Sequence, residues 1–147
     1  LIITFETYIC KIDHTLNPKD ENFLEEMRDL TCGGANIAIE TAGSGRALET
    51  AYEITRRGGT TVAAGMPGPV VNITLSHLSI AAEERVLKGS YMGSCVAQRD
   101  IPKYLDMFQT GKLPVDRLLS RKIKFEDLNE AMDRLDDAKT VREVLIP

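Results

Sequence analysis

The segment Gly43-Ser44-Gly45-Arg46-Ala47-Leu48 has the spacing that comes nearest to a glycine-rich phosphate loop. Such a loop uses three glycines to bring backbone N–H groups against a pyrophosphate at the start of a helix. Leu48 occupies the third glycine position, and its side chain would hold the helix away from the preceding strand. No acid lies among Thr61–Gly65, about 20 residues on, where one would bind the ribose hydroxyls. We therefore interpret the segment as an ordinary strand-to-helix turn and expect no primary phosphate loop in this chain.

Metal and nucleophile chemistry would have to draw on few residues. A zinc site needs about four Cys, His or acidic ligands, commonly with two of them close in sequence, and Cys10 with His14 is the one close pair. His77, in the context Leu-Ser-His-Leu, is typical of a surface or boundary position. A Ser-His-Asp or Cys-His hydrolase would need one of these two histidines, and neither signature surrounds them. We assign no catalytic residue and no metal ligand to the chain.

Three turns rich in small residues remain as candidates for ligand binding. They cover residues 40–43, 64–67 and 90–93, and each follows a segment that we predict to be a strand. In open parallel sheets, ligands bind at the carboxyl ends of the strands. We therefore expect the three turns to share one edge, where small residues allow the backbone to approach a flat ligand closely.

The hydrophobic pattern predicts the elements that would position these turns. The apolar run Ala35–Glu40 predicts a buried strand, and Thr60–Ala64 predicts another. Between them, apolar residues at helical spacing predict a helix that ends at Gly58-Gly59. Strand, helix and strand at this spacing form a βαβ unit of a parallel sheet. The other expected elements are helices near 21–31, 76–84, 100–110 and 125–138, and strands at 70–75, 86–92, 120–124 and 141–146.

Composition excludes several classes of partner. The 147 residues are 43% hydrophobic, which is enough for the core of an ordinary domain. The 18 basic and 22 acidic residues are interspersed, so we expect no nucleic-acid partner. The apolar runs are too short to span a bilayer, and we expect no membrane association. Three widely spaced cysteines, Cys10, Cys32 and Cys95, suit reduced thiols and predict a cytoplasmic protein.

Short motifs occur in one order along the chain, five of which are given below, and their order and spacing resemble the C-terminal portion of a zinc-type, medium-chain alcohol dehydrogenase. The resemblance covers nearly everything after residue 13, whereas residues 1–12 match poorly and begin at a leucine, as an incomplete or processed chain would. The motifs are Asn36-Ile-Ala-Ile-Glu40-Thr-Ala-Gly43, Arg57-Gly-Gly59-Thr-Thr-Val-Ala-Ala-Gly65-Met-Pro67, Leu87-Lys-Gly89-Ser-Tyr-Met-Gly93, Phe125-Glu-Asp-Leu-Asn-Glu-Ala131 and Val141-Arg142-Glu-Val-Leu145.

The resemblance implies an α/β fold. Residues 13–92 would form part of a doubly wound, Rossmann-type parallel sheet, and residues 93–147 would form a helix and the closing part of a GroES-like catalytic domain. It also implies an oxidoreductase that transfers hydride between an alcohol or aldehyde, a small-molecule substrate, and NAD(H), and that forms a homodimer or higher oligomer. The family's zinc ligands and the acid that selects NAD over NADP precede the matched region. NADP therefore stays an alternative, and we expect the chain alone to be inactive.

The resemblance further implies which residues face the cofactor. Those after the first strand would border its ribose, and backbone groups after the second and third strands would position its nicotinamide end. An arginine near the C-terminus would reach the cofactor phosphates, for which a guanidinium group is suited. The alternative for that arginine is an ordinary surface position. These residues are Thr41 and Ala42, then Ala64, Gly65, Met66, Ser90 and Met92, and lastly Arg142.

Two other functions stay open on the sequence. One is a non-catalytic binding or assembly module, since unpaired sheet edges favour association. The other is a zinc-free quinone or enoyl reductase of the same superfamily that uses NADPH. Residues upstream of the matched region would distinguish it from an alcohol dehydrogenase.

Overall fold

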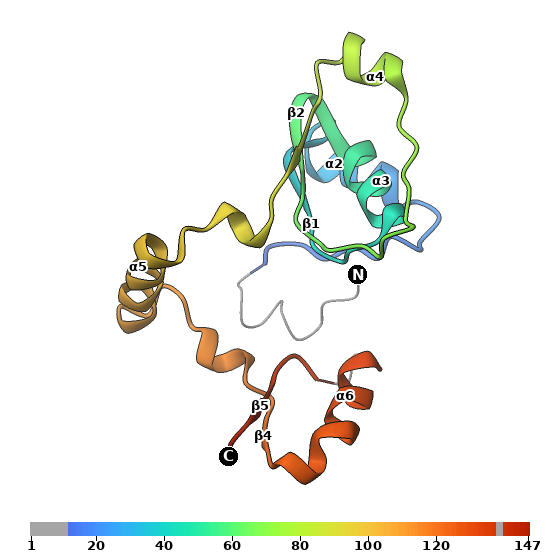
Figure 1. The fold of residues 1–147 in the computed structure, drawn as a ribbon. Coiled ribbons are helices and arrows are strands. Elements are labelled where there is room, and N and C mark those ends of the chain that lie inside the picture. The colour runs from blue at the N-terminus through green and yellow to red at the C-terminus, as the bar shows by residue number, and fades with distance from the viewer. Residues whose placement is uncertain (1–11, 138–139) are drawn as a thin grey trace. The chain divides into compact units, whose positions relative to one another are not determined.

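The computed structural model describes residues 12–137 and 140–147. In this part of the chain, contacts divide the residues into two compact units, which we describe separately (Figure 1). Unit 1 comprises residues 12–95, and unit 2 comprises residues 96–137 and 140–147. The N-terminal segment that resembles the family poorly lies outside the described residues, except for Ile12. None of the helices within the described ranges is long and apolar enough to cross a membrane.

Unit 1 contains a three-stranded parallel sheet, which confirms the predicted α/β class. Strands β1 (Ala35–Glu40), β2 (Thr55–Ala63) and β3 (Val86–Gly89) lie in that order across the sheet. Helix α3 (Gly45–Ile54) connects β1 to β2 and contacts both strands. Because β1 and β2 are parallel neighbours joined by a helix, they form the βαβ unit that the sequence predicted.

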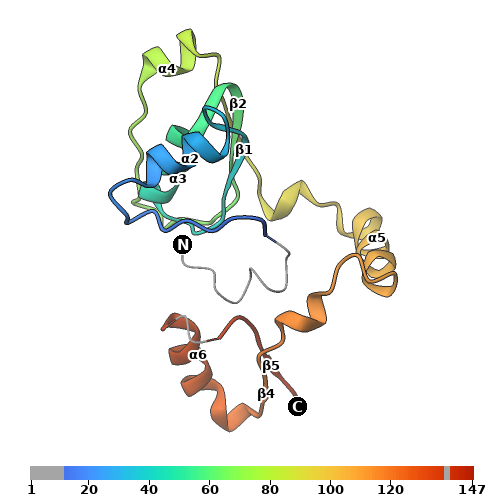
Figure 2. The same cartoon turned by 180° about the vertical axis from the view of Figure 1, so that it is seen from behind.

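Two further helices belong to unit 1. Helix α2 (Phe23–Leu30) precedes β1 and contacts α3 on the same side of the sheet (Figures 1 and 2). Helix α4 (His77–Ala82) lies in the connection from β2 to β3. A short 3-10 helix, η1 (Met92–Ser94), follows β3.

The face of the sheet toward α3 holds the core of unit 1. Ala38 of β1 and its register partner Thr61 of β2 are buried, with exposed fractions of 6% and 0%. Side chains alternate between the two faces of a strand, so Ile37 and Ile39 point to the opposite face. These two isoleucines are 64% and 63% exposed. Within the described residues, the helices therefore cover one face of the sheet and leave an apolar face open.

The boundary between α3 and β2 differs from the prediction. The sequence pattern predicted a helix through Arg57 and a strand from Thr60, whereas the helix ends at Ile54 and the strand begins at Thr55. Thr55 has an extended backbone, with φ −72° and ψ 130°, and pairs with Ala35 across a register shift. A β-branched residue suits this extended pairing. Arg56 and Arg57, which the sequence pattern placed in the last turn of the helix, therefore lie in β2.

The predicted strand at 70–75 is absent, and the predicted strand at 86–92 is shorter. Residues 71–76 are irregular, and the N–H of Thr74 donates to the Glu49 carboxylate at 2.7 Å, a side-chain partner in place of a strand neighbour. Strand β3 ends at Gly89, before three consecutive residues with positive φ that cannot continue a strand, Met92, Gly93 and Ser94.

Unit 2 contains two longer helices and a small parallel sheet. Helix α5 (Ala97–Gln109) begins three residues before the predicted start, and the Asp100 carboxylate in its first turn accepts from the Val96 N–H at 2.9 Å. Strands β4 (Arg121–Ile123) and β5 (Glu143–Leu145) pair in parallel. The remaining elements are the 3-10 helices η2 (Val115–Leu118) and η3 (Phe125–Asp127) and helix α6 (Leu128–Asp136).

A two-pronged ion pair joins α6 to β5. The Arg134 guanidinium donates through Nε and Nη2 to the two carboxylate oxygens of Glu143, at 2.8 and 2.7 Å. The Glu143 side chain is only 6% exposed. Hydrogen bonding to Arg134 lowers the pKa of Glu143, and Arg121 on the neighbouring strand adds to the attraction, while burial opposes it. This pair fixes the strand that directly follows Arg142.

Replacing Glu143 should destabilise unit 2 in a pH-dependent way. The pKa of Glu143 is lower in the folded state. The pair therefore stabilises the fold above the ordinary glutamate pKa of about 4.3, and this contribution is lost as the pH falls below that value. We expect Glu143→Gln to lower the melting temperature near neutral pH, with the difference from wild type narrowing between about pH 5 and about pH 3. Thermal denaturation followed by circular dichroism measures this.

Glu130→Gln is the matched control. Glu130 also pairs with Arg134, at 3.6 Å, but its side chain is 81% exposed, so its removal should change stability little. A Glu143→Gln variant that is as stable as the control near neutral pH would contradict the account. The account would also be contradicted if the melting temperature of Glu143→Gln were lower than that of wild type by the same amount at every pH.

Candidate functional site

The carboxyl ends of the three strands of unit 1 lie in register. Glu40 at the end of β1 pairs with Ala63 at the end of β2, which in turn pairs with Gly89 at the end of β3. The first residues beyond the strands continue this alignment, because the Ala64 N–H donates to the Glu40 carbonyl and the Ser90 N–H donates to the Ala63 carbonyl, both at 2.9 Å. The three turns therefore leave the sheet at one edge, as the sequence predicted.

The turns after β1 and β2 are in direct backbone contact. A Cβ atom added to Gly65 would overlap the Gly43 nitrogen, and one added to Gly43 would lie 2.5 Å from the Met66 carbonyl oxygen. Gly43 also has a φ of +68°, in the left-handed region that favours glycine. Both positions must therefore be glycine for the two turns to approach this closely.

The side chain of Glu40 holds the first turn in place. Its Oε1 accepts hydrogen bonds from the N–H groups of Gly43, at 2.6 Å, and Ser44, at 3.4 Å. Its main-chain carbonyl accepts from Ala64 and Gly65, both at 2.9 Å, and the residue is only 5% exposed. Sequence reasoning included Glu40 in the turn but gave it no role. The available signal was an acid that ends an otherwise apolar, buried strand.

Seven of the eight predicted cofactor residues lie in unit 1. Six follow the aligned strand ends directly: Thr41 and Ala42 after β1, residues 64–66 after β2, and Ser90 after β3. The seventh, Met92, begins η1 and is 77% exposed. Arg142 belongs to unit 2, where its N–H and carbonyl bond to the side chain and the N–H of Ser120, at 3.3 and 2.8 Å.

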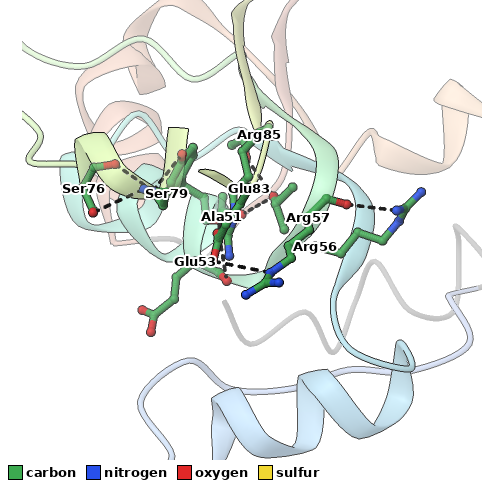
Figure 3. A network of polar contacts seen from close by, with 11 residues as sticks. Ala51, Glu53, Arg56, Arg57, Ser76, Ser79, Glu83 and Arg85 are labelled. Carbon is green, nitrogen blue, oxygen red and sulfur yellow. Dashed lines mark hydrogen bonds and ion pairs between the residues drawn. The ribbon is translucent and has the colours of Figure 1, made fainter. Parts of the chain in front are cut away.

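A second cluster that sequence reasoning missed anchors the start of β3 (Figure 3). The Arg85 guanidinium pairs with Glu83 at 2.6 Å and donates to the Tyr52 carbonyl of α3 at 2.5 Å. It also lies 5.2 Å from the centre of the Tyr52 ring, within the range of a cation–π contact. The Tyr52 hydroxyl in turn bonds to Ser79 of α4 at 3.0 Å. The connection that leads into β3 is thereby fixed to the helix that packs on the sheet.

The described residues do not fit a zinc site. Across 12–137 and 140–147, no three His, Cys, Asp or Glu side chains are grouped so that they could hold a metal ion. Cys32 and Cys95 are free thiols. Cys10, which forms the one close sequence pair with His14, lies outside the described residues. We therefore assign no step to a metal held by these residues.

Comparisons with known proteins identify the family of the chain. The family model described as "Zinc-binding dehydrogenase" matches residues 11–110. The chain is 30% identical over 134 residues to a geraniol dehydrogenase of Castellaniella defragrans, and the match covers 90% of the chain and 36% of that protein. It is 26% identical to an S-(hydroxymethyl)glutathione dehydrogenase of Paracoccus denitrificans, covering 90% and 37%. The chain thus spans about a third of the length of these curated relatives.

Solved structures share the fold. The benzyl alcohol dehydrogenase of Acinetobacter calcoaceticus superimposes with a TM-score of 0.87 at 22% identity, over 94% of this chain and 38% of that one. The 2R,3R-butanediol dehydrogenase of Bacillus subtilis superimposes with a TM-score of 0.71 at 28% identity, over 90% and 37%. These likenesses confirm the Rossmann-like sheet that the motifs implied.

Alanine at position 65 should force the two turns apart. We expect Gly65→Ala to lower the free energy of unfolding by about 1–3 kcal/mol, because a new methyl group is inserted into a closely packed site. Urea denaturation measures the change. Gly89→Ala is the control: a Cβ there meets no atom within 4 Å, so the expected change is no more than about 0.5 kcal/mol. Equal stability of the two variants would contradict the close approach of the turns.

Proposed function

The chain belongs to the zinc-binding dehydrogenase family, and we propose that it supplies the nicotinamide side of the cofactor cleft in an NAD(H)-dependent alcohol dehydrogenase. The observation that carries the proposal is the single edge of unit 1 at which three strand ends lie in register. Ligands of open parallel sheets bind at such an edge. The names of the relatives, which include geraniol dehydrogenase and S-(hydroxymethyl)glutathione dehydrogenase, support alcohol oxidation.

The backbone of this edge suits the carboxamide of a nicotinamide ring. The Ala64, Gly65 and Ser90 N–H groups already donate to carbonyls of the sheet. The Ala64 and Ser90 carbonyl oxygens, one after β2 and one after β3, are the backbone acceptors that we propose for the carboxamide NH2. Met92 has an exposed side chain, and we place it beside the ring. Thr41 and Ala42, both exposed, would border the ribose.

Bound NAD(H) supplies the hydride acceptor and donor of the reaction. The residues of this chain bind and orient it, and the close contact between the Gly43 and Gly65 turns keeps bulky side chains away from its path. In unit 2, Arg142 would contribute a guanidinium group to the cofactor phosphates. The substrate is a small-molecule alcohol or aldehyde, and the described residues contain no group of His, Cys, Asp or Glu side chains that could hold a metal ion to polarise its oxygen.

The proposal also holds that the active enzyme contains more polypeptide than this chain. The chain spans about a third of the length of its relatives. Parallel sheets are ordinarily covered on both faces, and the face that carries Ile37 and Ile39 is open. Strand β3 occupies an edge of the sheet, and an unpaired edge favours association, which supports a homodimer or higher oligomer. We place the enzyme in the cytoplasm because Cys32 and Cys95 are free thiols, as is usual in a reducing compartment.

Activity measurements test the proposed function. The dehydrogenase polypeptide that contains this segment, purified with zinc, should form NADH from NAD and a primary alcohol. Reduction of a quinone by NADPH without alcohol oxidation would overturn the proposal in favour of a zinc-free reductase. No turnover and no binding of either cofactor would overturn it in favour of a non-catalytic module.

The 147-residue chain should be inactive by itself. We expect no alcohol-dependent NADH formation from the isolated chain, with or without added zinc, because its described residues hold no group for polarising the alcohol. A parallel assay of the complete polypeptide serves as the positive control. Clear turnover by the isolated chain would contradict the proposal that further polypeptide is required.

A further inference from the structure

Glu40 is a buried carboxylate without a cationic partner in the described part of the chain. Its exposed fraction is 5%, and the ion pairs formed by the described residues all involve other acids. Burying a charged group is costly unless hydrogen bonds replace the lost water. The interactions that this side chain makes should therefore explain why it is there.

One carboxylate oxygen is committed to the turn after β1. Oε1 accepts from the N–H groups of Gly43 and Ser44, and Ser44 is the N-cap residue of α3. The positive end of the helix dipole lies at this terminus. The turn and the helix start thus compensate the negative charge and are themselves held by it.

The other carboxylate oxygen lies against the turn after β2. A Cβ atom added to Gly65 would stand 2.8 Å from Oε2, so this oxygen sits where the two turns pass each other. The Glu40 carbonyl holds the same second turn through the N–H groups of Ala64 and Gly65. A single residue therefore contacts both turns, one mainly through its side chain and the other mainly through its backbone.

We propose that Glu40 is a positioning residue that holds the turns 41–44 and 64–66 at the separation at which the cofactor binds. This inference rests on the proposed function. The residue acts through the backbone of its neighbours and makes no contact with the cofactor itself. The position of the turns depends mainly on whether the side-chain oxygen extends far enough to accept from the Gly43 N–H group. The negative charge of the side chain contributes less.

Four variants of the dehydrogenase polypeptide that contains this segment separate reach from charge and from stability. Glu40→Gln keeps an acceptor oxygen at the same reach and removes the charge. Glu40→Asp keeps the charge and shortens the reach by one methylene, and Glu40→Ala removes both. Thr55→Val is the control: it deletes a buried hydroxyl, bonded to Ala51 and Thr61 at 2.7 Å, at the opposite end of β2 from the turn.

The KM for NAD is the kinetic readout. We expect Glu40→Asp and Glu40→Ala to raise it by about tenfold, and Glu40→Gln by about threefold or less, with the KM for the alcohol within about twofold of wild type throughout. Thr55→Val should be less stable and keep the wild-type KM for NAD. The inference is overturned if Glu40→Asp and Glu40→Ala keep the wild-type KM for NAD, or if Glu40→Gln raises this KM as much as Glu40→Ala does. It is also overturned if Thr55→Val raises the KM for NAD as much as Glu40→Ala does.

Hydrogen exchange of the Gly43 amide is a readout that needs no cofactor. In the 147-residue chain we expect exchange at this amide to be about tenfold faster in Glu40→Asp than in Glu40→Gln. Equal rates would overturn the inference even if all variants bind NAD. If the wild-type polypeptide binds no NAD(H), the proposed function fails, and the exchange rates alone decide whether Glu40 holds the turn.

Discussion

The close approach of two backbone turns at the end of the sheet is the constraint on which the rest of unit 1 depends. Gly43 and Gly65 leave no room for a side chain between the turns, and the Glu40 carboxylate bonds the first turn in place. The alignment of the strand ends brings the turns together. The alternating burial of β1 directs Ala38 toward the helices and Glu40 toward the same covered side. The edge is therefore a consequence of sheet register.

The elements that the sequence predicted well have a strong local signal. The apolar run of β1 and the helical spacing in α3 depend on residues that are close in the chain, and both elements form nearly where expected. The predicted start of β2 at Thr60 was wrong. Strand β2 begins at Thr55, whose extended conformation depends on pairing with Ala35, 20 positions earlier in the chain. The segment 70–75 alternates like a strand, yet Glu49 supplies the hydrogen-bond partner of Thr74. Such long-range partners are not visible in a local pattern.

The site was predictable in outline and not in detail. Small residues after three strands indicated a shared edge, and the register of the strands forms it. The sequence did not reveal which N–H groups of the turns are hydrogen-bonded, because the bonds from Ala64 and Gly65 to Glu40 depend on how the turns cross. The role of Arg85 was equally hidden, since its contacts with Tyr52 and Glu83 join an arginine to a helix more than 30 residues earlier.

The central claim is that this edge receives the nicotinamide end of the cofactor, and an NMR titration of the isotope-labelled 147-residue chain with NADH tests it most directly. We predict that amide signals from residues 41–44, 64–66 and 90–92 shift with increasing NADH, while those of α4, which leads into the opposite end of β3, do not. Shifts confined to other parts of the sheet, or none at millimolar NADH, would contradict the account.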